Sequence, residues 1–427
     1  MTLPRNRRPL QSRWFLRLII LTLALIPLSA TIGKTRPGID GLRADHYRVL
    51  QGKRVGLLTN PAGVDSSGIP TLDILFRAPE VKLVALFGPE HGIYGDEQAN
   101  EPVDNKIDPK TRLPVYSLYG KYRTPTAQML KGIDVMVIDL QDIGVRSYTY
   151  VSCMRLTMQA CFLNGVEVVI LDRPNPLGGL KVDGPLLEKE FRSYVGAFQV
   201  PYVHGLTIGE LARIAKATPG WLEIPDDVRK QGKLTIVPLS GWKREMTWDR
   251  TGLQWVPTSP IIPNLSAVLG YAMTGLGSEI NSFRHGYGTE YPFRLLSNPS
   301  VSTDTLLNAL QKLDLPGMHF VKTNATNPKG AKVEGVYVQV TDWNKVSPTA
   351  LSFRMMPLAC QLEKKNRYRE ASKNKVDLFN KHVGSASWWK EIHSRGAQAN
   401  TDKFLTRWKK DADEFQAWSA KFWIYRE

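Results

Sequence analysis

The chain has 427 residues, of which 42% are apolar and 22% charged, and it carries three cysteines. A chain of this length and composition can bury the cores of two domains without disulfide support, which excludes a disordered chain, a small disulfide scaffold and a polytopic membrane protein. Its formal net charge of +16 is concentrated at the ends, because residues 1–36 carry seven basic and no acidic side chains and residues 361–427 carry 15 basic against nine acidic ones.

The first 32 residues predict an export signal or an N-terminal anchor. Five arginines precede or enter an apolar run of 11 residues, 18–28, which is followed by the small residues Ser29 and Ala30. The run is shorter than the roughly 20 residues that a spanning helix needs. Leu28 stands where a signal peptidase prefers a small side chain, so an uncleaved membrane anchor is the alternative to cleavage. We expect an exported protein, periplasmic or secreted, whose folded part begins near Gly41.

Five short apolar runs follow, separated by helical patterns. The expected strands are 54–60, 81–87, 114–119, 134–139 and 166–171, and the expected helices are 71–77, 126–131 and 148–164. The second, fourth and fifth runs are almost continuous in Val, Ile and Leu, as strands covered on both faces are. Alternation of strand and helix predicts an α/β fold with a doubly wound parallel sheet over residues 41–238.

The pattern changes near Val237, where Trp, Pro and Gly become frequent. Strand-like segments such as 333–340 stand among long loops, and the chain from about 370 is helical and rich in Trp. We therefore expect a smaller α+β domain over residues 239–427 with a helical tail. The cysteines Cys153, Cys161 and Cys360 are interpreted as buried free thiols, because the first two lie roughly 12 Å apart along one helix.

Polar side chains follow the predicted strands and converge on one edge of the sheet. Parallel sheets bind ligands beyond the carboxyl ends of their strands. The residues at these ends are Asn60 after the first strand, Glu90 and His91 after the second, Gln141, Asp142 and Arg146 after the fourth, and Asp172, Arg173 and Asn175 after the fifth.

Several site types have no support in the sequence. Asn60-Pro61-Ala62-Gly63 is neither a dinucleotide fingerprint nor a phosphate-binding loop, and no Gly-x-Ser-x-Gly elbow occurs. The seven histidines show no metal-ligand spacing, so we expect no metal and no cofactor. Neither basic end combines its charge with a base-stacking platform, so we expect no nucleic acid partner.

What remains is carboxylate and imidazole chemistry. Glu90 is placed for general-acid work, although it could instead cap a helix or pair with an arginine. Asp142 is a second carboxylate or the N-cap of the following helix. Arg146 could clamp an anion or neutralise Asp142, and Tyr148 and Tyr150 could stack on a sugar or belong to the core.

The strand-end blocks closely resemble the exo-β-N-acetylmuramidase family. The most specific block is Gly88-Pro89-Glu90-His91-Gly92, and the others are 59–65, 113–120, 139–150, 171–179, 204–210 and 255–260. These blocks occur in order from about Gly41 to the C-terminus.

The resemblance implies an exo-acting glycoside hydrolase that releases terminal β-1,4-linked N-acetylmuramic acid from the non-reducing end of peptidoglycan fragments. It also implies a Rossmann-like N-terminal domain, a smaller C-terminal domain and a cleft between them. The family's proposed catalytic glutamate maps onto Glu90.

The resemblance is weaker in the C-terminal half. Glu279 and Asn281 keep their places in a family motif, whereas the neighbouring arginine is displaced to Arg284 and Glu290 is acidic. Arg146, Arg173 and Arg284 are candidates for the lactyl carboxylate, because guanidinium binds carboxylates with two donors. Asp142 or His91 would position water or orient the sugar.

Two other classes stay open at this point. One is a wall-binding module without turnover, whose basic tail contacts anionic polymer. The other is a metal-dependent hydrolase with Asp139, Asp142, His91 and Asp172 as ligands. The sequence leaves the oligomeric state unknown.

Overall fold

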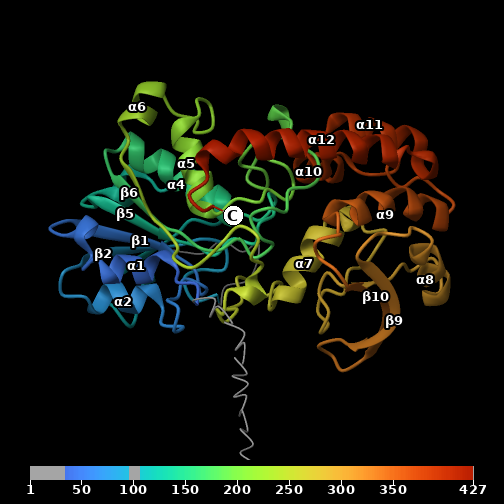
Figure 1. The fold of residues 1–427 in the computed structure, drawn as a ribbon, viewed down its shortest axis with the longest axis horizontal. Helices are drawn as coiled ribbons and strands as arrows, with labels where there is room; N and C mark the ends of the chain where they lie inside the picture. Colours follow the sequence, from blue (N-terminus) through green and yellow to red (C-terminus); the bar gives the residue numbers. More distant parts are fainter. Residues whose placement is uncertain (1–33, 96–105, 427) are drawn as a thin grey trace, which may run out of the picture. The chain divides into compact units, whose positions relative to one another are not determined.

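The computed structural model describes residues 34–95 and 106–426, so the predicted export segment lies outside the described residues. Within the described residues, seven strands form one sheet in the order β3-β4-β2-β1-β5-β6-β7. Strands β2, β1, β5 and β6 of this sheet are labelled in Figure 1. The strands are β1 (Arg54–Thr59), β2 (Lys82–Gly88), β3 (Lys106–Ile107), β4 (Pro114–Ser117), β5 (Val135–Asp139), β6 (Glu167–Leu171) and β7 (Leu234–Val237). All neighbours pair in parallel except β3 and β4, which are antiparallel.

Helices cover both faces of this sheet, because its central strands are apolar on both sides. Val135 and Val137 of β5 belong to one core with α1 and α2, whereas Met136 and Ile138 belong to the other core with α4 and α5. The helices are α1 (Gly38–Ala44), α2 (Thr71–Arg77), α3 (Ala127–Leu130), α4 (Tyr150–Leu163), α5 (Ile208–Ala217) and α6 (Asp226–Gln231). The prediction of a doubly wound parallel sheet is confirmed.

The strand order reverses at β1. The chain passes from β1 to β2 on one side, and later enters β5 on the other side. At such a reversal the loops after neighbouring strands diverge and leave a crevice at the carboxyl ends. Asn60, Glu90 and Gln141 follow β1, β2 and β5 at this edge.

A second sheet occupies the C-terminal half. Its strands are β8 (Leu295–Leu296), β9 (Met318–Thr326) and β10 (Lys332–Val340), paired antiparallel in the order β8-β10-β9. They pack with α7 (Leu265–Thr274), α8 (Thr303–Gln311) and α9 (Pro348–Leu362) around a separate apolar core (Figure 1). The α/β class with a smaller α+β part is therefore confirmed.

The tail is helical, as predicted, and returns to the first sheet. It contains α10 (Lys373–Val383), α11 (Ala386–Arg395) and α12 (Thr401–Ser419). Beyond α12, Tyr425 donates a hydrogen bond of 2.5 Å from its phenol to Oδ2 of buried Asp172. Trp423 stacks on the guanidinium of Arg244, with 3.8 Å from Cζ to the ring centroid. The division at residue 239 stays a prediction, since the end of the tail packs on the first sheet.

The predicted elements omit five that belong to the first sheet or flank it: α1, β3, α5, α6 and β7. The helix α5 begins at a capping box, in which Thr207 accepts from the backbone of Glu210 and Glu210 accepts from the backbone of Thr207. The predicted free thiols are confirmed, since Cys153, Cys161 and Cys360 are all buried and unpaired. Among residues 34–95 and 106–426, no helix is long and apolar enough to cross a membrane.

Candidate active site

Glu90 lies in a tight turn at the carboxyl end of β2. The backbone N–H of Gly92 donates to the carbonyl of Pro89 at 3.0 Å, which closes a four-residue turn. His91 has φ +71° at the third position, where a type II turn requires positive φ and usually carries Gly or Asn. A non-glycine residue held in this conformation is strained, and such strain is frequent at functional sites.

The turn opens into a cavity of about 510 Å³. Its lining includes Glu90 and His91 from the turn, and Tyr148, Thr149 and Tyr150 from the segment that leads into α4. Glu90 is the one carboxylic acid among the described residues that line this cavity. Its Oε2 accepts a hydrogen bond of 2.9 Å from the hydroxyl of Thr149. We call this the Glu90 cavity.

Tyrosines form much of the cavity wall and are held by hydrogen bonds. The phenol of Tyr148 donates to Oγ1 of Thr258 at 2.8 Å, and that of Tyr150 donates to the carbonyl of Thr258. Burial raises the pKa of both phenols, and it also raises the pKa of Tyr271, to which Glu279 and Glu90 add. These phenols are therefore neutral at physiological pH. Tyr148 and Tyr150 are buried members of the apolar core, so they form a fixed wall of the cavity.

Asp142 and Asn175 build the loops beside the cavity and do not line it. Oδ2 of Asp142 accepts from the backbone of Gly144 at 2.8 Å and lies 3.5 Å from Nε2 of His204. Asn175 bonds the backbone of Leu206 and Leu177 at 3.0 Å each. Gly144 has φ +79°, and a Cβ there would meet Oδ1 of Asn175 at 2.3 Å.

Arg146 has partners other than those that the sequence suggested. It is buried, and its guanidinium donates to the carbonyls of Pro185 and Val200 at 2.7 and 2.8 Å and to those of His382 and Val383 at 2.9 Å each. Burial lowers its pKa to about 10, so it stays charged at neutral pH. Arg146 therefore ties the loop after β5 to the end of α10 rather than facing the cavity.

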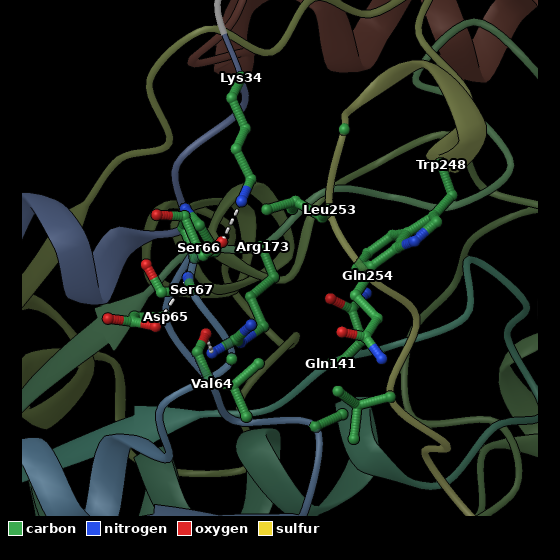
Figure 2. A pocket seen from close by; sticks show the side chains of 15 residues that line it. Lys34, Val64, Asp65, Ser66, Ser67, Gln141, Arg173, Trp248, Leu253 and Gln254 are labelled. Carbon is green, nitrogen blue, oxygen red and sulfur yellow. Dashed lines mark hydrogen bonds between the residues drawn. The ribbon is translucent and has the colours of Figure 1, made fainter.

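Arg173 and Gln141 lie in a second, smaller cavity of about 160 Å³ (Figure 2). Arg173 pairs with Asp139, with 2.5 Å from Nε to Oδ1, and donates to the carbonyl of Val64 at 2.8 Å. Gln141 donates to two backbone carbonyls, and its backbone N–H donates to the amide oxygen of Asn60 at 3.4 Å. Asn60 is buried and lines neither cavity.

The C-terminal candidates are placed differently from one another. Glu279 follows a short 3-10 helix (Leu276–Ser278), and its Oε1 lies 2.6 Å from Nδ1 of His382, which lines the Glu90 cavity. Asn281 and Arg284 are exposed and lie outside this lining. The sequence leaves His382, Arg123, Tyr194 and Tyr271 unnoticed, although they line the cavity, because single residues in loops and helices carry no local signal.

The proposed metal ligands do not gather at one point. Asp139 is paired with Arg173, and Asp172 accepts from Thr207, Gly209 and Tyr425. Burial raises the pKa of Asp172 to about 6. Across the described part of the chain, no three His, Cys, Asp or Glu side chains are grouped as a metal site would require.

Comparisons with known proteins give one family across the chain. A family model described as exo-beta-N-acetylmuramidase NamZ, N-terminal, matches residues 55–266, and its C-terminal counterpart matches residues 269–425. The peptidoglycan beta-N-acetylmuramidase NamZ of Bacillus subtilis is 43% identical over 316 residues, which are 73% of this chain and 74% of the relative.

Two solved structures from Bacteroides fragilis, both titled as DUF1343 family proteins, are similar in fold. One is 40% identical with a TM-score of 0.82, and the other is 27% identical with a TM-score of 0.70. Each comparison covers 92% of this chain and 99% of the other.

Replacing Arg146 tests its structural role. Arg146→Met leaves the carbonyls of four residues without their donor, so we expect the free energy of unfolding to fall by about 3 kcal/mol or more in urea titrations. Arg146→Lys keeps the charge but not the forked arrangement of donors. Its free energy of unfolding should lie between that of Arg146→Met and that of the native protein. The exposed Arg77 supplies the control Arg77→Met. Equal stability of Arg146→Met and Arg77→Met would contradict the role given to Arg146.

Proposed function

The chain belongs to the exo-β-N-acetylmuramidase NamZ family, and we propose that it releases terminal β-1,4-linked N-acetylmuramic acid from the non-reducing end of peptidoglycan fragments. The observation that carries this proposal is Glu90, the one carboxylic acid in the described lining of a tyrosine-rich cavity. Glycosidases need an acid beside the scissile oxygen and a surface that holds the sugar ring. The Glu90 cavity offers both.

We propose Glu90 as the general acid. Thr149 donates to Oε2 of Glu90 at 2.9 Å, and Oε1 has no hydrogen bond within the described residues. Oε1 is therefore available for the leaving oxygen. In this role Glu90 gives its proton to the glycosidic oxygen as the bond to the anomeric carbon breaks. The role of the next residue, His91, in positioning water or orienting the sugar stays a prediction.

Recognition of the lactyl carboxylate is proposed to come from Arg123. Arg123 lines the Glu90 cavity, and its guanidinium lies 4.3 Å from the ring centroid of Tyr194. No carboxylate of the described residues pairs with it, whereas Lys381, also in the lining, pairs with Asp377 at 2.6 Å. An exposed guanidinium stacked on an aromatic ring is held in place and keeps its donors for a ligand.

We also propose that the protein is exported, with residues 1–32 as signal or anchor. The basic and apolar pattern of this segment supports the proposal. Fractionation of cells that express the full chain, with mass spectrometry of its N-terminus, tests it. We expect the protein outside the cytoplasm, either shortened near residue 30 or intact in the membrane fraction; intact protein in the cytoplasm would contradict export.

Glu90→Gln should lower kcat on a muramic acid-terminated disaccharide by about 100-fold or more, because the amide cannot donate a proton as an acid does. Product release is followed by chromatography, and folding is checked by circular dichroism. Glu80→Gln, at the exposed entrance to β2, is the control. Native turnover by Glu90→Gln would remove Glu90 from the mechanism, and binding without turnover by the native protein would instead indicate a wall-binding module.

Arg123→Ala should reduce the preference for the anionic sugar. The ratio of kcat/KM between a chromogenic N-acetylmuramic acid glycoside and the matching N-acetylglucosamine glycoside should fall about 10-fold or more, as expected for a lost hydrogen bond to a charged group. Lys121→Ala, from the same exposed loop, should leave this ratio unchanged. Equal losses on both glycosides would argue against contact between Arg123 and the lactyl carboxylate.

A further inference from the structure

An imidazole–carboxylate pair lies beside the Glu90 cavity, with its imidazole in the lining. Nδ1 of His382 lies 2.6 Å from Oε1 of Glu279. Both side chains are largely covered, with 16% and 18% of their surface exposed, and His382 lines the Glu90 cavity. Glu279 comes from the segment after α7, whereas His382 is next to last in α10. Two distant segments of the chain therefore meet to form this pair.

The backbone holds His382 in place. Arg146 donates to the carbonyls of His382 and Val383 at 2.9 Å each. Gly384 ends the helix with φ +75°, and a Cβ at this position would meet Nη2 of Arg146 at 2.8 Å. The glycine therefore permits both the left-handed helix end and the close approach of the guanidinium.

The orientation of the ring leaves one nitrogen for the cavity. Nδ1 is buried and lies 2.6 Å from Oε1 of Glu279 without hydrogen-bond geometry, so Nε2, on the other edge of the ring, is the nitrogen left for the cavity. Both Glu279 and Glu90 lie close enough to Tyr271 to raise the pKa of its phenol, although burial is the larger cause. The pair and the proposed acid therefore both lie near one tyrosine of the cavity wall.

The rest of the lining lacks a second group for the reaction. The ionisable groups that face His382 or share its cavity are Glu279, Glu90, His91, Arg123, Lys381 and the tyrosines. Because no second carboxylate of the described residues reaches the cavity, an enzyme-bound glycosyl ester has no evident nucleophile, which leaves the substrate's own acetamido group or water to attack the anomeric carbon. A direct displacement by water needs a base that accepts a proton from the water.

We propose that His382, oriented by Glu279, is the base that accepts a proton from the attacking water. This inference rests on the proposed function. The oxygen of water bonds to the anomeric carbon and passes its proton to Nε2 of His382. The bond from the anomeric carbon to the leaving oxygen breaks, and that oxygen takes the proton of Glu90. Glu279 stabilises the resulting imidazolium, as a carboxylate does for the histidine of other acid–base sites.

Variants at His382 and Glu90 should respond differently to the leaving group. His382→Gln should lower kcat by about 100-fold on both the disaccharide and a 4-nitrophenyl glycoside of N-acetylmuramic acid. Glu90→Gln should lower kcat far less on the 4-nitrophenyl glycoside than on the disaccharide, because nitrophenolate leaves without a proton. His319→Gln, which changes an exposed histidine of β9 outside this cavity, is the control.

Azide distinguishes the loss of a base from a structural defect, because it can restore activity only where the rest of the site is intact. Azide needs no deprotonation, so it should restore turnover of the 4-nitrophenyl glycoside by His382→Gln and give the α-glycosyl azide. Glu279→Gln should show a smaller loss of kcat than His382→Gln and the same rescue. In a plot of kcat against pH, the native protein should lose activity on the acid side, where the base is protonated. His382→Gln should not show this loss.

The outcomes separate this inference from the proposed function. If the native protein cleaves the disaccharide but His382→Gln does so at the native rate, the base assignment is wrong and the function stands. If His382→Gln is folded by circular dichroism but azide does not rescue it, the assignment is also wrong. If the native protein cleaves neither substrate, the proposed function itself fails.

Discussion

The site depends on one buried guanidinium that joins two parts of the chain. Arg146, on the loop after β5, satisfies four backbone carbonyls, two of them at the end of α10. Burying a charge is costly unless hydrogen bonds replace its water, and here four of them do. Because α10 carries His382, the place of its imidazole in the lining of the Glu90 cavity depends on the hydrogen bonds from Arg146 to this helix end.

The parallel sheet supplies the other half of the geometry. Its strand order reverses at β1, so polar loops diverge at the carboxyl edge, and the turn after β2 presents Glu90 there. The neighbouring polar residues mostly support these loops: Asp139 holds Arg173, and Asp142 and Asn175 bond backbone groups. The polar groups of these loops therefore serve the backbone, because irregular buried backbone needs hydrogen-bond partners.

Much of this fold could be read from the sequence, since the strands are short apolar runs whose observed bounds lie within a few residues of those expected. Glu90 could be singled out because topology alone places strand ends at one edge. The partners of Arg146 could not, since a guanidinium binds carbonyls as well as carboxylates and His382 is 236 residues away. His382 itself lies in a polar helix. The sequence does not indicate that Glu279 lies beside it, because only the tertiary structure brings the two residues together.

Both proposals require that the Glu90 cavity cleaves a terminal muramic acid. Proton NMR of the native protein with synthetic N-acetylmuramic acid-β-1,4-N-acetylglucosamine tests it most directly, with the reversed disaccharide, N-acetylglucosamine-β-1,4-N-acetylmuramic acid, as a second sample. We expect the first disaccharide to yield both free sugars, with muramic acid appearing first as its α-anomer, and the second to remain intact. Persistence of the first disaccharide, or equal cleavage of both, would show that the chain is not an exo-acting muramidase of this kind.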